Sequence, residues 1–135
     1  MELRILKTLK YRITFPSPYS FLKRYLLVGL AETRLIHLSC FILEGTLLSC
    51  NLLRFLPSEL AAGSVYLARC VTNSSPFCAA IANVSGYTEK KVAYAARAIL
   101  QERAALPPVC FRSINRKYMT DQFSGVAATR FPNSI

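Results

Sequence analysis

Residues 54–89 read RFLPSELAAGSVYLARCVTNSSPFCAAIANVSGYTE and carry two clear helix-start signals. The first is Leu56-Pro57-Ser58, because proline fits the first turn of a helix, where its missing N–H has no intrahelical partner. The small residues that follow, from Ala61 to Ser64, let a neighbouring helix approach closely. The second is Ser85-Gly86-Tyr87-Thr88, which turns the chain and places a threonine as the N-cap of a new helix. The stretch therefore predicts helices that pack through small side chains.

The composition of the whole chain also favours helices. Its 135 residues suffice for about one domain with a single core, and 53% of them are hydrophobic. Glycine is sparse, with 5 residues, and the 7 prolines separate helical patterns instead of interrupting them. We therefore predict an all-α fold.

Apolar side chains that recur every three or four residues mark the expected helices. These cover residues 2–10, 18 to about 29, 31 or 32 to about 50, 57 onward, 76 or 77 to about 83, 88 to about 105, and 111–118. Ser17 and Pro18 should start the second helix, and Thr88 should cap the long sixth one. The third helix is apolar almost all round, so we expect it to be the most buried, through Leu38, Phe41, Ile42, Leu47 and Leu48.

Residues 35–56 are the one stretch that suggests a membrane span by length and low charge. Glu44 lies near the middle of this stretch, and a carboxylate is costly at that depth in a bilayer. The first twelve residues, MELRILKTLKYR, carry charges throughout and do not form a secretory signal. We expect a protein that acts inside the cell, in the nucleus or the cytoplasm, and has no membrane partner.

No catalytic or metal-binding set can be assembled from the sequence. The single histidine, His37, lies three residues from Cys40, but a zinc site needs two more ligands. The 7 carboxylates are scattered and the 5 glycines stand apart, which predicts neither an acid–base pair nor a phosphate loop. The 5 cysteines include no C-x-x-C pair, and their odd number fits a reducing compartment. We expect no enzyme activity, metal, cofactor or small-molecule substrate.

The order of the motifs along the chain resembles a known family. Upstream of residues 54–89 stand LKYRITFPSP (residues 9–18) and Phe21-Leu22, and downstream stand INRKY (residues 114–118) and FSGV (residues 123–126). Each motif is weak alone, but together they extend over most of the chain. In order and spacing they resemble the C-terminal box of an A/B-type, or mitotic, cyclin.

The resemblance implies a domain scheme. Cyclins contain two consecutive five-helix boxes, and residues 1–15 are similar to the last helix and exit of the first box. Residues 16–108 would then form the C-terminal box, and residues 109–135 a short helix and an irregular tail. On this scheme most of the N-terminal box is missing, because the chain is either a truncated sequence or a genuinely shortened cyclin.

The resemblance also implies a partner, a cyclin-dependent protein kinase, and a role as its regulatory subunit in the cell cycle. Cyclins grip the kinase mainly through the first box, with a Lys–Glu pair and apolar side chains. Glu2 matches the acidic member of that pair, while Leu6, Tyr11 and Ile13 match apolar contact positions. The lysine has no counterpart, so we expect the chain to bind a kinase weakly without the N-terminal box.

One alternative rests on charge. The net charge of +10, from 17 basic and 7 acidic residues, suits a helical adaptor or nucleic-acid-binding module built on the same box. The basic residues are dispersed along the chain, however, which is typical of solvated helix faces. Clustering on one face would favour the alternative, and the residues to watch are Arg97, Arg103, Arg112 and Lys117.

Overall fold

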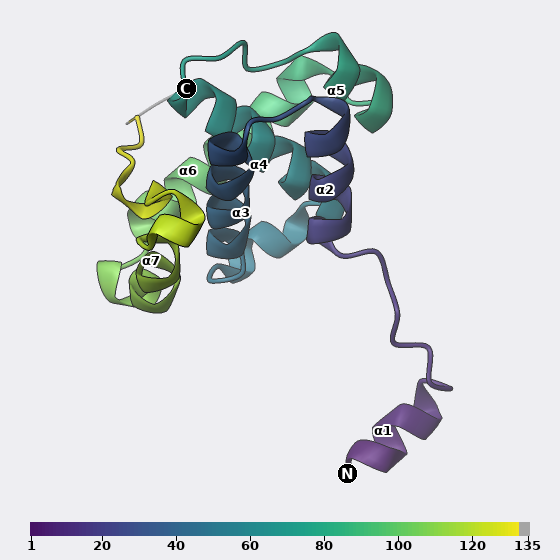
Figure 1. Cartoon of the computed structure of the whole chain (residues 1–135). Helices are drawn as coiled ribbons and strands as arrows, with labels where there is room; N and C mark the ends of the chain where they lie inside the picture. Colours follow the sequence, from purple (N-terminus) through teal and green to yellow (C-terminus); the bar gives the residue numbers. More distant parts are fainter. Residues whose placement is uncertain (133–135) are drawn as a thin grey trace.

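The computed structural model describes residues 1–132, and over that range the chain is helical without a β-strand. The α-helices are α1 (Glu2–Thr8), α2 (Pro18–Val28), α3 (Thr33–Thr46), α4 (Pro57–Val71), α5 (Ala79–Ser85), α6 (Glu89–Ala105) and α7 (Arg112–Tyr118). Four 3-10 turns join them or follow them: η1 (Cys50–Arg54), η2 (Pro108–Phe111), η3 (Asp121–Phe123) and η4 (Val126–Ala128). Helices α2 to α6 form the bundle, and α1 projects from it on an extended linker (Figure 1). The predicted all-α fold is confirmed.

Local chemistry accounts for the helix starts. Ser17 Oγ accepts a hydrogen bond from the Ser20 N–H at 3.4 Å, and Pro18 follows in the first turn of α2, as predicted. At α4 the N-cap is Leu56, which has no polar side chain, and its own N–H donates to Glu59 Oε2 at 2.9 Å. Thr88 occupies the N-cap position of α6 but makes no side-chain hydrogen bond there, so only its position was predicted correctly.

Glu59 also binds the neighbouring helix α6, since Lys91 Nζ lies 2.6 Å from its Oε1. Burial raises the pKa of Glu59, but hydrogen bonds from Lys91 and from the Leu56 N–H outweigh it, and the pKa falls below its ordinary value. A lowered carboxyl pKa means that the ionised form is favoured by folding. The carboxylate therefore stabilises the fold at neutral pH.

This predicts a pH dependence for the substitution Glu59→Gln. The substitution should lower the free energy of unfolding near pH 7, where the wild-type carboxylate is ionised. The difference from wild type should shrink once the pH falls below about 4.5, the ordinary carboxyl pKa, and vanish below the lower folded-state pKa. Urea unfolding of both proteins across this range measures it. A difference that stays constant as the pH falls would show that the charge of Glu59 contributes nothing.

The centre of the bundle is α4, not α3 (Figure 1). It packs against α2, α3 and α6, and none of its residues is exposed, whereas α3 exposes three residues near its start. Leu47, which was expected in the core, is 77% exposed. The prediction that the third helix is the most buried was therefore wrong. Small side chains on α4, such as Ala61 and Ala62, let neighbours close in on several sides, while the larger side chains of α3 hold them further from its axis.

Helix α3 also ends at Thr46, earlier than predicted, because a distant residue stabilises the break. Ser49 caps η1 and accepts a hydrogen bond from the Asn51 N–H at 3.3 Å. The carboxylate of Glu102, on α6, accepts from Ser49 Oγ at 2.5 Å and from Asn51 Nδ2 at 3.1 Å. These two hydrogen bonds lower the pKa of Glu102. The end of α3 is thus fixed by a contact across the bundle.

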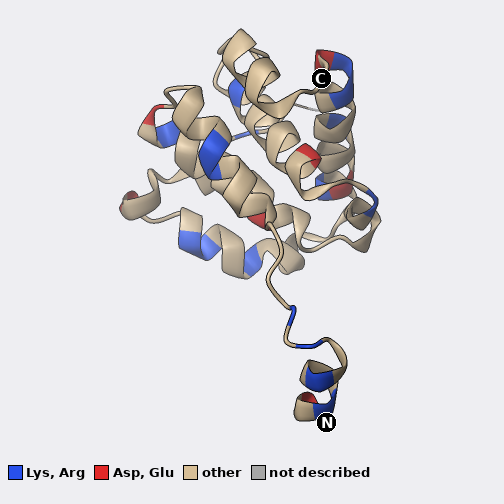
Figure 2. Ribbon diagram, turned by 90° about the vertical axis from the view of Figure 1, so that its right-hand side faces the viewer, with Lys and Arg blue, Asp and Glu red and all other residues tan. Residues whose placement is uncertain are grey.

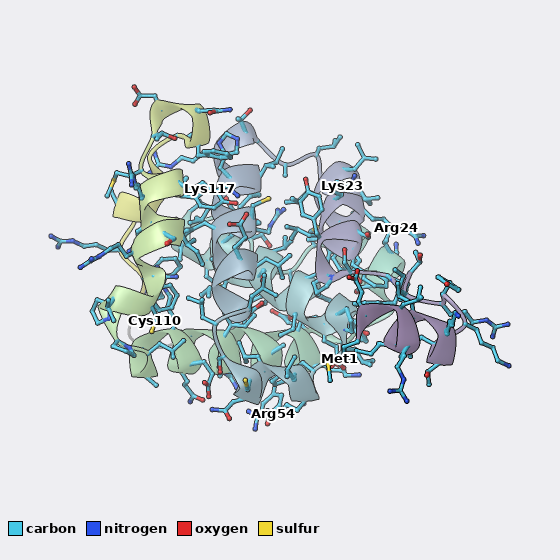
Figure 3. The ribbon with its side chains drawn as sticks, turned by 90° about the horizontal axis from the view of Figure 1, so that it is seen from below. Met1, Lys23, Arg24, Arg54, Cys110 and Lys117 are labelled. Carbon is cyan, nitrogen blue, oxygen red and sulfur yellow. The ribbon has the colours of Figure 1, made fainter. Side chains whose placement is uncertain are left out.

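The last part of the described chain, from Phe111 onward, packs on the side of α3 opposite α2 (Figures 1 and 3). It buries Phe111, Tyr118 and Val126. Glu44 of α3 accepts hydrogen bonds from the Tyr118 hydroxyl at 2.7 Å and from Lys117 Nζ at 2.6 Å. Burial and the Glu44 carboxylate raise the pKa of Tyr118. We call this group of three residues the Glu44 clasp; it explains a carboxylate near the C-terminal end of the apolar helix α3.

Candidate partner-binding site

The segment that the sequence predicted as a kinase contact stands apart from the bundle. None of the residues of α1 is buried, and Figures 1 and 2 show the helix separated from the other helices by its linker. The apolar side chains of α1 and the linker are about half exposed or more, at Leu3, Ile5, Leu9, Tyr11, Ile13 and Phe15. An exposed apolar run of this kind is typical of a surface that binds another protein.

The four residues predicted to contact a kinase all lie in the projecting segment of α1 and its linker. Glu2 and Leu6 are one helical turn apart on α1 and therefore share a face. Helix α1 ends at Thr8, before the predicted residue 10, because Lys10 and Tyr11 adopt left-handed conformations with φ of 49° and 57°. The Tyr11 N–H donates to the Leu6 carbonyl at 3.0 Å, which keeps Tyr11 beside the end of the helix.

Ile13 follows this turn, and its N–H donates to the Tyr11 carbonyl at 3.1 Å. Leu6 is partly buried, while Glu2, Tyr11 and Ile13 are exposed. The local turn thus holds one carboxylate and three apolar side chains on the same projecting segment. This arrangement can present apolar side chains beside one carboxylate, in a segment that also carries four Lys or Arg side chains. Which partner it contacts stays a prediction.

The structure shows what two of the basic residues named by the alternative contact. The Arg103 guanidinium stacks on three aromatic rings, with its Cζ 4.4–4.7 Å from the centroids of Phe41, Phe111 and Phe131. Lys117 is engaged in the Glu44 clasp. Lysine and arginine are otherwise spread over several helices and the linker (Figure 2). Two of the four residues named by the alternative thus serve the fold.

His37 lies at the contact between α3 and the C-terminal segment. Its Nδ1 is 3.0 Å from Ser124 Oγ, and its ring meets the Phe123 ring edge-on at a centroid distance of 5.5 Å. In residues 1–132 no group of three or more His, Cys, Asp or Glu side chains is placed to hold a metal ion. Within the same range no helix is both long enough and apolar enough to cross a membrane.

A second exposed apolar surface was missed in the sequence. It lies between α2 and α3 and includes Leu27 and Leu30, which are 78% and 90% exposed. Val28, at the end of α2, is 38% exposed. The continuous apolar run YLLVGL (residues 25–30) was the available signal, because a helix packed on one side cannot bury all of it.

Comparison with known proteins matches residues 16–132 to the family described as "Cyclin, C-terminal domain". The chain is 31% identical over 133 residues to Cyclin-B1-1 of Oryza sativa subsp. japonica, with 94% of this chain and 30% of that protein covered. It is 35% identical over 130 residues to Cyclin-B2-1 of Arabidopsis thaliana, again with 94% and 30% covered. The G2/mitotic-specific cyclin-B of Emericella nidulans is 30% identical over 122 residues, with 90% and 25% covered.

The chain therefore spans about 30% or less of the length of these three curated relatives. They are all B-type cyclins, in agreement with the mitotic subgroup indicated by the motifs. The match covers α2 to α7 and the turns that follow them. This chain belongs to the cyclin family, and residues 16–132 form its cyclin C-terminal domain.

Proposed function

We propose that this chain acts as a regulatory subunit that binds a cyclin-dependent protein kinase in the cell cycle, without catalytic activity of its own. Membership of the cyclin family supports the cell-cycle role. The single observation that carries kinase binding is the projecting segment of α1 and its linker, which holds Leu6, Tyr11 and Ile13 away from the core. We further propose that it acts in the nucleus or the cytoplasm, which its odd number of cysteines supports.

The bundle's part in this role is to support an N-terminal cyclin box and to offer a secondary docking surface, since the projecting segment stands apart from it. A standard protein interface buries about 800 Å² on each partner. One helix of seven residues and its linker supply only part of that area, so affinity should depend on further surface. Glu2 is exposed, and an exposed ion pair contributes only about 0–1 kcal/mol. We therefore assign most of the binding energy of this segment to its apolar side chains.

The test measures the affinity of a purified cyclin-dependent kinase for two proteins by biolayer interferometry. The first is the 135-residue chain. The second carries, before Met1, the part of Oryza sativa Cyclin-B1-1 that precedes the matched region. We expect weak binding by the first and much tighter binding by the second. In the second protein Leu6→Ala should lower the affinity about tenfold, which corresponds to about 1.4 kcal/mol.

Two further variants make the result specific. Glu2→Ala should lower the affinity less than Leu6→Ala, because its charge is solvated. Leu47→Ala is the matched control, since Leu47 is an exposed leucine at the end of α3 and should leave binding unchanged. Tight binding by the 135-residue chain that neither Leu6→Ala nor Glu2→Ala alters would show that the kinase contacts lie elsewhere.

A further inference from the structure

An open apolar groove of about 690 Å³ lies between α2 and α3, in the bundle and not on the projecting helix. Its exposed lining comes from Tyr19, Lys23, Leu27, Leu30 and Ile36. Groove volumes in this range accept a small ligand or a few side chains of a partner. Leu27 and Leu30 are the two most exposed apolar residues of the lining, so their side chains bury little within the described chain.

The backbone at Leu30 gives the groove a second distinguishing feature. Leu30 adopts a left-handed conformation with φ of 47°, which is unfavourable for a bulky side chain. The preceding residue, Gly29, would adopt it freely but has φ of −77°. The fold thus holds a leucine in a strained conformation at the surface, where it is 90% exposed and packing in this chain offsets little of the strain. Strain of this kind commonly marks a functional position.

The charge around the groove restricts its partner. Lys23 is the one charged side chain in the lining, and its Nζ lies 5.5 Å from the centroid of the Tyr19 ring. Arg24 follows on the same helix, and Figure 3 labels both basic residues on α2. No carboxylate lines the groove. The chain's own exposed apolar segment, α1 with its linker, is also basic, with four Lys or Arg residues against Glu2. A second copy of this chain would therefore meet like charge.

We propose that the groove between α2 and α3 binds a short segment of another protein that carries leucine-like side chains flanked by acidic residues. Apolar side chains of that segment cover Leu27 and Leu30, and its carboxylates lie near Lys23. Attraction between these carboxylates and Lys23 favours such a segment over other apolar sequences. This surface is separate from the projecting segment and adds a docking site to the proposed kinase contact.

The test uses two fluorescein-labelled helical peptides of about three turns, or 11 residues. The acidic probe has leucines on one face and glutamates elsewhere, and the basic probe has the same leucines with lysine in place of every glutamate. Fluorescence anisotropy with the 135-residue chain should show the acidic probe binding at least about tenfold more tightly. Lys23→Glu should reverse this preference. Equal affinity for the two probes, or no binding of the acidic one, would overturn the proposal.

Leu30→Gly separates binding from folding. It should weaken binding of the acidic probe about tenfold while raising the thermal unfolding midpoint, because glycine accepts the left-handed conformation without strain. Leu27→Ser should also weaken binding. The matched control is Leu53→Ser, which changes an 80% exposed leucine on η1. If Leu53→Ser weakened binding of the acidic probe as much as Leu27→Ser does, the probe would be binding non-specifically to exposed apolar side chains, and the proposal would be wrong. Self-association that Leu30→Gly abolishes would instead make a second copy the occupant and refute the proposed partner.

Discussion

Replacing Phe41 with alanine should lower the free energy of unfolding by about 3–5 kcal/mol, which threatens a domain whose total stability is about 5–15 kcal/mol. Phe41 is fully buried on α3. Its ring centroid lies 5.3 Å from that of Tyr118 and 6.2 Å from that of Phe131, and the Arg103 guanidinium stacks on it. The substitution therefore opens a cavity where α3 meets the C-terminal segment and removes one of the rings around a largely desolvated cation.

Urea unfolding followed by circular dichroism measures this loss. Phe15→Ala is the matched control, because Phe15 is 73% exposed in the linker and its removal should change stability by no more than about 0.5 kcal/mol. A loss below about 1 kcal/mol for Phe41→Ala would mean that the ring is not packed between α3 and the C-terminal segment.

Replacing Gly63 with valine should destabilise the fold by about 3 kcal/mol, the upper part of the usual range for overpacking. A Cβ at Gly63 would lie 3.1 Å from the Ala95 Cβ and 3.1 Å from the Ala96 backbone nitrogen. Neither neighbour is the end of a flexible side chain, so helices α4 and α6 would have to separate. Valine adds two further methyl groups to that crowded Cβ. The same unfolding assay measures the result.

Gly45→Ala is the control for this prediction, since both glycines lie within helices. A Cβ at Gly45 would meet Phe111 Cε1 at 3.3 Å, so this buried ring must shift slightly, while an Arg103 guanidinium nitrogen at 3.5 Å lies at an ordinary van der Waals distance. Alanine gains up to about 1 kcal/mol of helix propensity over glycine. Gly45→Ala should therefore be nearly neutral. If Gly63→Val proved equally neutral, the close approach of α4 and α6 would be refuted.

The sequence predicted the helices well because their signals are local. Ser17 and Pro18 start α2 as expected, and the long helix after Thr88 ends at Ala105. The end of α3 could not be read in this way, because Ser49 and Asn51 bind Glu102, more than 50 residues further along. Hydrophobic periodicity shows which face of a helix is buried, but carries no signal for a partner at that distance.

The choice of central helix failed for a different reason. Counting large apolar residues favoured α3, yet α4 occupies the centre because its small residues let α6 approach at Gly63. Apolar content predicts burial, whereas the distance between helix axes depends on side-chain size. The candidate kinase contacts came from the resemblance to cyclins alone. The groove at Leu30 was missed because the apolar run of residues 25–30 does not show by itself which of its side chains the packing of α2 and α3 leaves exposed.

The Glu44 clasp has a consequence for the order in which the chain folds and opens. Its hydrogen bonds join residues 73 and 74 positions apart, and the contact between His37 and Ser124 joins residues 87 positions apart. Closing a longer loop loses more chain entropy, so these contacts form after the more local pairing of α2, α3 and α4. In native-state hydrogen exchange the amides of α7 should lose protection before those of α4. The C-terminal segment is then the last part of the domain to fold and the first to open.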